Sequence, residues 1–332
     1  MHAQRSPLTL GLLIAMIVVA LQALLVPLFA GPAARIGARD LPIGVTGPPT
    51  VTQAVADRLT AEHPGAFTIN QITDAAALDD AIRDRSVYGG IVITAAGAEM
   101  HVASAAGPAV ATLLSQAAAG LQAPVRDVVP LHSGDLRGTG FGAGFLPLAI
   151  GSLLAGLLIF LAVRGRRARL IALLTFGALS GLGAGAVLHY WLDVLPGEYL
   201  VNATVLGLFS LAVAATMTGL GAVLDRAGLA LGALTVFLVG NALSAVSSAP
   251  ELLPQPWGAV GQWLPIGSGA TLLRSIAYFD GNGGGTAALI LGTYAVVGLA
   301  LVAIGRRGLA DHPVPAAAGT SDERARNVTL AG

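Results

Sequence analysis

The sequence predicts an α-helical polytopic membrane protein with six transmembrane helices and a small extracytoplasmic α/β domain inserted after the first of them. Composition is the first observation: 55% of the 332 residues are hydrophobic, 11% are charged, and the mean hydropathy is +0.75. A soluble domain has about a quarter charged residues. Second, six stretches stay apolar for about the 20 residues that a membrane helix needs. Third, the charges gather between these stretches, above all in residues 31–137.

The six apolar stretches have a one-plus-five layout. The first is residues 8–30, and the other five lie within residues 138–307, as the uncharged runs 138–163, 170–192, 199–224, 227–250 and 281–305. A cleaved signal peptide is the alternative for the first stretch, since LFAGPAA supplies small residues. The apolar run from Leu8 to Ala30 is, however, longer than the usual signal core of about 7–15 residues. We therefore expect an uncleaved span.

Arginine sets the expected orientation, because the cytoplasmic flanks of membrane helices have the excess of basic residues. The turn RGRRAR between the second and third spans supplies Arg164, Arg166, Arg167 and Arg169. The same side would hold Arg5, Arg226, Arg306 and Arg307. Residues 1–7 and a disordered tail, 308–332, are thus expected in the cytoplasm of a bacterium, with the spans in its inner or plasma membrane. The turn either sets topology and contacts lipid head groups or docks a cytoplasmic partner.

Residues 31–137 predict the external α/β domain. We expect strands at 41–46, 67–73, 88–94 and 99–103, and helices at 51–62, 74–85 and 108–121. This β-α-β-α-β-β-α order implies a largely parallel sheet with right-handed crossovers. Asp79, Asp80 and Asp84 are interpreted as the solvated face of the second helix.

Residues 251–280, between the last two spans, are expected to form an external amphipathic or re-entrant element. The stretch is rich in Pro, Trp and Gly, and residues 271–279 are amphipathic. Trp257 and Trp263 suit the head-group zone of a bilayer. Arg274 could snorkel from a helix that dips into or lies on the outer leaflet. The alternative is an interfacial helix that only anchors the loop.

Glycines suggest one helix contact and two flexible joints. Gly177, Gly181 and Gly185 recur every four residues, which permits close helix approach, and we favour a contact within the chain over one across a dimer. GTGFGAG at 138–144 lacks the spacing of a dinucleotide loop and is interpreted as a hinge. GNGGG at 281–285 is interpreted as a turn before the last span.

A few polar residues fall in or beside the spans. Asn202 and Asn241 are expected to hydrogen-bond between helices, with the lining of a substrate path as the alternative. His189 and Asp193 are four residues apart beside Tyr190 and are interpreted as a wet helix end. A proton relay or a metal pair is the alternative, because ionisable groups in a membrane are often functional.

The residue types that are missing exclude several functions. There is no Cys, hence no disulfide, thiolate zinc site or Cys nucleophile, and no Lys, hence no standard P-loop ATPase. The net charge is zero, so the chain as a whole has no nucleic-acid-binding signature. No Ser/His/Asp set or H-x-x-x-H pattern stands out. We therefore expect no enzyme, no metal, no cofactor on this chain and no nucleic-acid partner.

The layout and two loose motifs resemble the permease subunits of ABC type-2 exporters, with the phage-infection-protein-like branch nearest. In that branch the external segment opens with a strand like LPIGVTG and continues to one like YGGIVIT. QWLPIGSGATLLRSIAYFDG is similar to the element before the last span. The resemblance covers most of residues 8–307. It implies export driven by a separate cytoplasmic ATPase that consumes ATP, and a permease that works as a homo-oligomer among membrane lipids.

Two groups of residues follow as site candidates for a permease that moves a hydrophobic or amphipathic compound outward. The external gate or interface would be Trp263, Pro265, Arg274 and Phe279. The cytoplasmic partner or lipid contact would be the four arginines of RGRRAR. Only MHAQRSP precedes the first span, without the family's elbow helix, and RGRRAR is short for a coupling helix. These departures leave open a non-transporting envelope scaffold or receptor-like protein whose external domain binds a partner.

Overall fold

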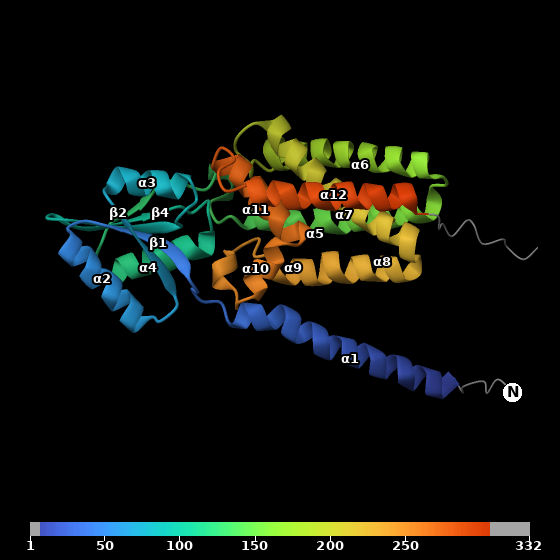
Figure 1. The fold of residues 1–332 in the computed structure, drawn as a ribbon, viewed down its shortest axis with the longest axis horizontal. Helices are drawn as coiled ribbons and strands as arrows, with labels where there is room; N and C mark the ends of the chain where they lie inside the picture. Colours follow the sequence, from blue (N-terminus) through green and yellow to red (C-terminus); the bar gives the residue numbers. More distant parts are fainter. Residues whose placement is uncertain (1–6, 306–332) are drawn as a thin grey trace, which may run out of the picture.

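A computed structural model describes residues 7–305, which form an α/β lobe and a helical bundle (Figure 1). The lobe lies at one end of the bundle, and most bundle helices run along the long axis of the molecule. The expected cytoplasmic residues 1–6 and tail 308–332, with Arg5, Arg306 and Arg307, lie outside the described residues.

Six helical segments among residues 7–305 are long and apolar enough to cross a membrane, which indicates a multi-pass membrane protein. One precedes the lobe in the chain and five follow it. The segments are α1 (Pro7–Ala34), α5 (Thr139–Ala162), α6 (Arg166–Ala186) continued by the π-helical turn η2 (Val187–Trp191), α7 (Tyr199–Leu224), α8 (Arg226–Gly232) continued by η3 (Ala233–Val239) and α9 (Gly240–Leu243), and α12 (Gly285–Ile304).

The fifth of these segments ends earlier than the sequence predicts. The apolar run extends to residue 250, but the helix stops at Leu243. Ala245 then takes a left-handed conformation with φ 52°, and the N–H of Ser248 donates to its carbonyl oxygen at 3.1 Å. Hydropathy alone does not mark this end, because the turn is made of small residues and contains no charge.

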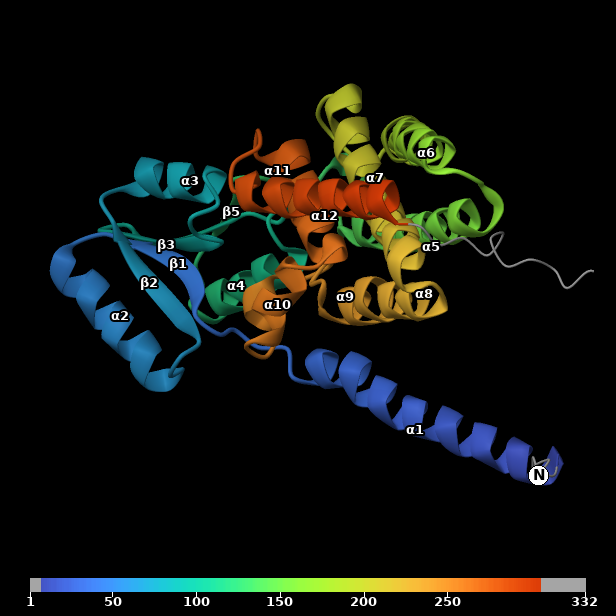
Figure 2. The same ribbon diagram turned by 45° about the vertical axis from the view of Figure 1, so that its right-hand side comes forward.

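Helix α7 is the most buried of the six segments and packs against α5, α6 and α12. The glycines of α6 face it. A Cβ atom on Gly181 would lie 2.7 Å from both Cα and N of Gly207, and one on Gly177 would lie 3.0 Å from Cβ of Leu211. The close approach therefore occurs within the chain. Helix α1, in contrast, leaves the bundle at an angle and packs on α9 near its lobe end (Figure 2).

The lobe contains a five-stranded mixed sheet in the order β2-β1-β3-β4-β5. The strands are β1 (Leu41–Thr46), β2 (Phe67–Ile72), β3 (Gly89–Thr94), β4 (Gly97–Val102) and β5 (Val125–Asp127). Only the β3–β4 hairpin is antiparallel, so the expected largely parallel sheet is confirmed. The sequence does not predict β5, because three exposed residues give no alternation to recognise.

Helices cover both faces of this sheet (Figure 2). Helix α3 (Ala75–Arg83) lies on one face, and α2 (Pro49–Glu62) and α4 (Pro108–Gly120) lie on the other. Leu78 of α3 is fully buried and reaches the sheet at Gly44 and Gly90, where a Cβ atom would collide with it. The two glycines thus let the helix sit close to the central strands.

Asp79 is not solvated, which corrects the interpretation of the acidic face of α3. Its carboxylate is 8% exposed and lies 2.7 Å from Nδ1 of His101, itself 1% exposed. Arg126 reaches the other carboxylate oxygen at 3.2 Å. Asp80 and Asp84 are exposed, as expected. The sequence spacing alone could not show that β4 places a histidine under the first turns of α3.

The glycine-rich segment before α5 is a helix start, not a hinge. Gly138 has φ 65°, and α5 begins at the next residue. The buried carboxylate of Asp135 accepts the backbone N–H groups of Gly140 at 3.0 Å and Phe141 at 2.7 Å. These bonds satisfy N–H groups that a helix start otherwise leaves unpaired. GNGGG forms the expected turn, with positive φ at Gly281 and Gly283.

Candidate functional site

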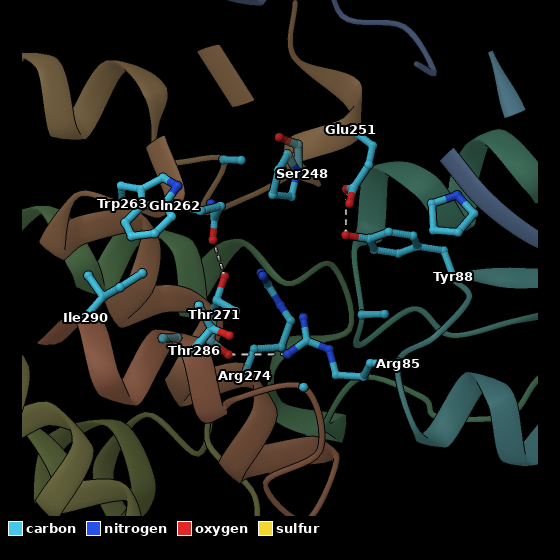
Figure 3. A pocket seen from close by; sticks show the side chains of 16 residues that line it. Arg85, Tyr88, Ser248, Glu251, Gln262, Trp263, Thr271, Arg274, Thr286 and Ile290 are labelled. Carbon is cyan, nitrogen blue, oxygen red and sulfur yellow. Dashed lines mark hydrogen bonds between the residues drawn. The ribbon is translucent and has the colours of Figure 1, made fainter. Parts of the chain in front are cut away.

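A cavity of about 320 Å³ lies where the lobe meets the bundle, and we name it the junction cavity (Figure 3). One wall comes from the lobe, through the loop after α3 and the start of β3. The others come from the chain after α9, from α11 (Pro265–Tyr278) and from the first turns of α12. The ten labelled side chains that line it are Arg85, Tyr88, Ser248, Glu251, Gln262, Trp263, Thr271, Arg274, Thr286 and Ile290.

Backbone and side-chain bonds hold the lobe to the bundle around this cavity. The guanidinium of Arg39 and the N–H of Gly37 both donate to the carbonyl oxygen of Leu252, each at 3.0 Å. On the other side, the amide of Asn282 donates to the Asp84 carboxylate at 3.2 Å. The cavity walls are therefore fixed at two places by contacts between residues about 200 positions apart in the chain.

Tyr88 and Glu251 form the polar pair of one wall. The Tyr88 hydroxyl donates to Oε2 of Glu251 at 2.8 Å (Figure 3). Burial, and then the negative charge of Glu251, raise the pKa of Tyr88 well above its usual 10.0. The hydroxyl therefore keeps its proton and remains a donor to the carboxylate at any physiological pH.

Arg85 and Arg274 lie near each other in the cavity (Figure 3). Arg85 follows α3, donates to the carbonyl oxygen of Thr271 at a long 3.4 Å and lies 5.3 Å from the Phe279 ring centre. Arg274, on α11, is 6% exposed and donates to the carbonyl oxygen of Val246 at 2.6 Å. Both guanidinium groups use an aromatic face or a carbonyl oxygen as a partner.

Neither guanidinium forms an ion pair within residues 7–305. Burial, and then the positive charge of Arg85, lower the pKa of Arg274 to about 10, so the two cations repel each other. Burial also lowers the pKa of Arg85, while Glu251 partly offsets this. Buried charges are normally paired. The cavity thus has two cationic groups against one carboxylate, which already accepts from Tyr88.

The structure brings two of the four gate candidates, Trp263 and Arg274, to the lining of this cavity. Trp263 follows α10 (Trp257–Gln262) and lines the wall with its ring 65% exposed, and Arg274 lies inside. Phe279 is buried in the lobe core beneath Arg85. Pro265 begins α11 and is buried away from the cavity lining. These positions come from the one short stretch 263–279.

Arg274 does not snorkel to a bilayer surface, contrary to the expectation. Helix α11 packs against α7, α9 and α12, and the lobe covers its other side. The Arg274 guanidinium lies 4.9 Å from the ring centre of Phe141, at the start of α5. The amphipathic pattern of residues 271–279 arises because one side of α11 meets apolar helices and the other meets a polar cavity.

The RGRRAR turn lies at the opposite end of the bundle from the lobe (Figure 1). Helix α5 links them and has 24 residues, a length of about 36 Å at about 1.5 Å per residue. Arg164, Arg166 and Arg167 are exposed. Arg169 differs, because it is buried and donates to the carbonyl oxygens of Phe160 at 3.0 Å and Val163 at 2.9 Å. It closes the end of α5, so three arginines remain exposed for a partner or for lipid.

The polar residues near the spans contact separate partners. Asp193 faces His132, with its carboxylate 3.8 Å from Nδ1, while the His189 ring packs on Tyr190. No group of three or more potential metal ligands occurs in the part of the chain that the structure describes. Asn202 donates to the carbonyl oxygen of Pro196 at 2.8 Å, in the loop before its own helix, not to another helix as expected. Asn241 lines a small cavity beside α1.

Sequence reasoning missed most of the cavity. The sequence indicates Arg85 only as the last residue of the helix expected at 74–85, and Tyr88 only as the first residue of the strand expected at 88–94. Glu251, Gln262 and Thr271 gave no signal, although Thr271 donates to Oε1 of Gln262 at 2.6 Å. The sequence offers one cue, a basic and an aromatic residue just before a buried strand. It cannot show that Tyr88 pairs with Glu251, because the two residues are 163 positions apart.

Comparison with known proteins adds no relative from which a function could be transferred: no family model, no curated protein and no solved structure matches this chain.

Proposed function

We propose that this chain is a permease-like membrane subunit of an ABC type-2 exporter that moves a hydrophobic or amphipathic compound outward, with a separate ATPase as its energy source. The observation that supports this most is the junction cavity, which lies at one end of a bundle of apolar helices and is walled by both polar and apolar side chains. Small-molecule sites commonly lie between domains and between helices of bundles.

The proposed orientation places the lobe outside the cell and the RGRRAR turn in the cytoplasm, with both termini cytoplasmic and the subunit in a homo-oligomer. The three exposed arginines of the turn and Arg226 at the start of α8 support it. Basic residues near span ends favour the cytoplasmic side. Because α5 is about 36 Å long, the lobe and the turn lie on opposite faces of a bilayer with a core of about 30 Å.

In this proposal the stretch 263–279 forms the outer gate together with the lobe. Trp263 and Arg274 line the cavity, and Phe279 lies in the lobe core. A movement of the lobe relative to α12 would therefore change the cavity through α11. The ATPase would bind at the opposite end of the bundle, where Arg164, Arg166 and Arg167 are exposed. The free energy of ATP hydrolysis would drive the movement of the helices from there.

The absence of cysteine gives a direct test of orientation. Ala61→Cys on exposed α2 and Ala168→Cys in the exposed turn each create a chain with one thiol. We expect a membrane-impermeant maleimide to label the Ala61 variant in intact cells and the Ala168 variant only after permeabilisation. Labelling of both in intact cells, or the reverse order, would refute the orientation and the cytoplasmic ATPase contact with it.

The ATPase is tested by purification in mild detergent from the native host. We expect a nucleotide-binding subunit to co-purify, and the double variant Arg166→Gln/Arg167→Gln to lose most of it. The matched control Arg58→Gln/Arg83→Gln removes two exposed arginines from the lobe instead and should retain it. Recovery of no ATPase, together with unchanged export after deletion of the gene, would reject the exporter.

A non-transporting envelope scaffold or receptor-like protein is the second candidate, and one observation favours it. Helix α5 ends at Ala162 and α6 begins at Arg166, so no helix parallel to the membrane lies in this turn. Helices α7 and α8 are likewise separated by Asp225 alone. Without such a helix, only short turns between the spans are available as a binding surface for an ATPase. If the lobe captures a partner while deletion leaves export unchanged, this candidate replaces the first.

A further inference from the structure

The charge inside the junction cavity points to the chemistry of its ligand. Two guanidinium groups reach it, yet each donates to a single carbonyl oxygen, at 3.4 Å for Arg85 and 2.6 Å for Arg274. A guanidinium has several N–H donors in a planar fork. Within residues 7–305 most of these donors are therefore not used by protein acceptors. A desolvated, mutually repelling pair of cations is stabilised by an anion placed between them.

The cavity also has the shape of an amphipathic site. The arginines and the Tyr88–Glu251 pair lie toward one side of the cavity, and Trp263 and Ile290 lie toward the other, with the polar Gln262 and Thr271 between them (Figure 3). A volume of about 320 Å³ is at the small end of ligand pockets. It holds a head group and the first part of a chain, and Trp263, which lines it, is exposed.

We propose that the junction cavity binds the anionic head group of an amphipathic molecule, a carboxylate or a phosphate, between Arg85 and Arg274, with its apolar tail toward Trp263. Arginine suits this role because its planar fork binds both anions through paired hydrogen bonds. The inference rests on the proposed function, whose cargo it assigns to a chemical class. Binding does not require the ATPase, so the two can be tested separately.

Glu251 makes the proposal testable in two directions. Its carboxylate accepts from Tyr88 and also lines the cavity, where its charge opposes an incoming anion. Glu251→Gln keeps an acceptor for the Tyr88 hydroxyl and removes the charge. This change should strengthen anion binding, whereas a loss of either arginine should weaken it. A gain of affinity cannot result from misfolding.

The experiment uses the full chain in phosphatidylcholine nanodiscs, with Trp191→Phe and Trp257→Phe so that Trp263 is the only indole and reports binding by fluorescence. The probes are decyl phosphate, decanoate, decyltrimethylammonium and inorganic phosphate. We expect saturable binding of the two anionic amphiphiles, at least about tenfold tighter than that of the cation, since a charged hydrogen bond is worth about a factor of ten or more.

The variants distinguish a site from general attraction to a basic protein. Arg85→Gln should weaken decyl phosphate binding about tenfold or more, and Glu251→Gln should strengthen it about threefold or more. Arg58→Gln changes the net charge as Arg85→Gln does, but on the exposed helix α2 away from the cavity, and should have no effect. Equal effects of these two arginine variants would overturn the proposal, as would weaker binding after Glu251→Gln.

Two further outcomes separate the parts of the argument. Equal affinity for inorganic phosphate and decyl phosphate would overturn the proposal that the ligand is amphipathic, because the decyl tail would then contribute nothing to binding. Export that is intact while decyl phosphate and the decyl cation bind equally would reject the head-group assignment and leave the exporter standing. Head-group binding without any export would support the assignment and reject the exporter.

Discussion

Packing between α6 and α7 can be tested at a single glycine. Gly181→Ala adds one methyl group at a point where its Cβ would meet the carbonyl oxygen of Ala203 and lie 2.7 Å from backbone atoms of Gly207. Backbone atoms cannot rotate away as the end of a flexible side chain can. The helices must therefore separate, and neighbouring contacts along the glycine row are lost with them.

The expected cost follows from general packing energetics. Forcing an extra methyl group into a tight contact costs about 1–3 kcal/mol. Gly183→Ala is the matched control, because nothing lies within 4 Å of the Cβ position on the same helix. There the substitution should be neutral or stabilise the helix by up to about 1 kcal/mol, since alanine is the better helix former. The two variants should thus differ by about 1–4 kcal/mol.

Thermal unfolding of the purified chain in a mild detergent measures this difference. For a chain of 332 residues, 1 kcal/mol corresponds to about 1.4 °C in Tm. We expect Gly181→Ala to melt about 1–6 °C below Gly183→Ala. If the two variants have the same Tm, then α6 does not pack against α7 through its glycine row, and the reasoning is refuted.

Three further predictions concern the lobe. Leu78→Ala should cost about 2–5 kcal/mol of unfolding free energy, since the side chain is fully buried against the sheet; a loss below 1 kcal/mol measured by denaturant titration would contradict this packing. Asp79→Ala should cost about 1–3 kcal/mol because it leaves buried His101 without its partner, while Asp80→Ala, exposed on the same helix, should stay within about 0.5 kcal/mol. Burial raises the pKa of Tyr88 above 10.0, so its contribution to stability is present below pH 10 and is lost as the pH rises further. Tyr88→Phe should therefore leave the ultraviolet titration of the folded chain up to pH 11 unchanged and remove one ionising tyrosine in denaturant.

The sequence predicts the elements whose signal is local. Long apolar runs locate all six candidate spans, and alternating or periodic patterns locate four strands and three helices of the lobe. Elements that depend on other parts of the chain were missed. Strand β5 forms because β4 offers an edge, and the fifth span stops where a left-handed Ala245 turns the chain. Neither feature changes the hydropathy of the residues concerned.

The candidate site shows the same division. Trp263 and Arg274 stand out in sequence because an indole and a cation are rare in an apolar stretch. Their surroundings do not: Arg274 was expected at a bilayer surface, but α11 is covered by helices and by the lobe. The pairing of Tyr88 with Glu251 depends on how two distant segments fold together, and no single-sequence pattern reports such a contact.

Helix α1 is fastened to the other helices near its lobe end and is exposed to its surroundings along most of its length. In a bilayer, acyl chains fill the wedge between α1 and its neighbours. Its tilt can then follow membrane thickness at little cost in protein packing, since a span adapts to mismatch by leaning. A change in bilayer thickness would thus exert a force on residues 35–40, which connect α1 to the sheet. Lipid composition could in this way change the position of the lobe.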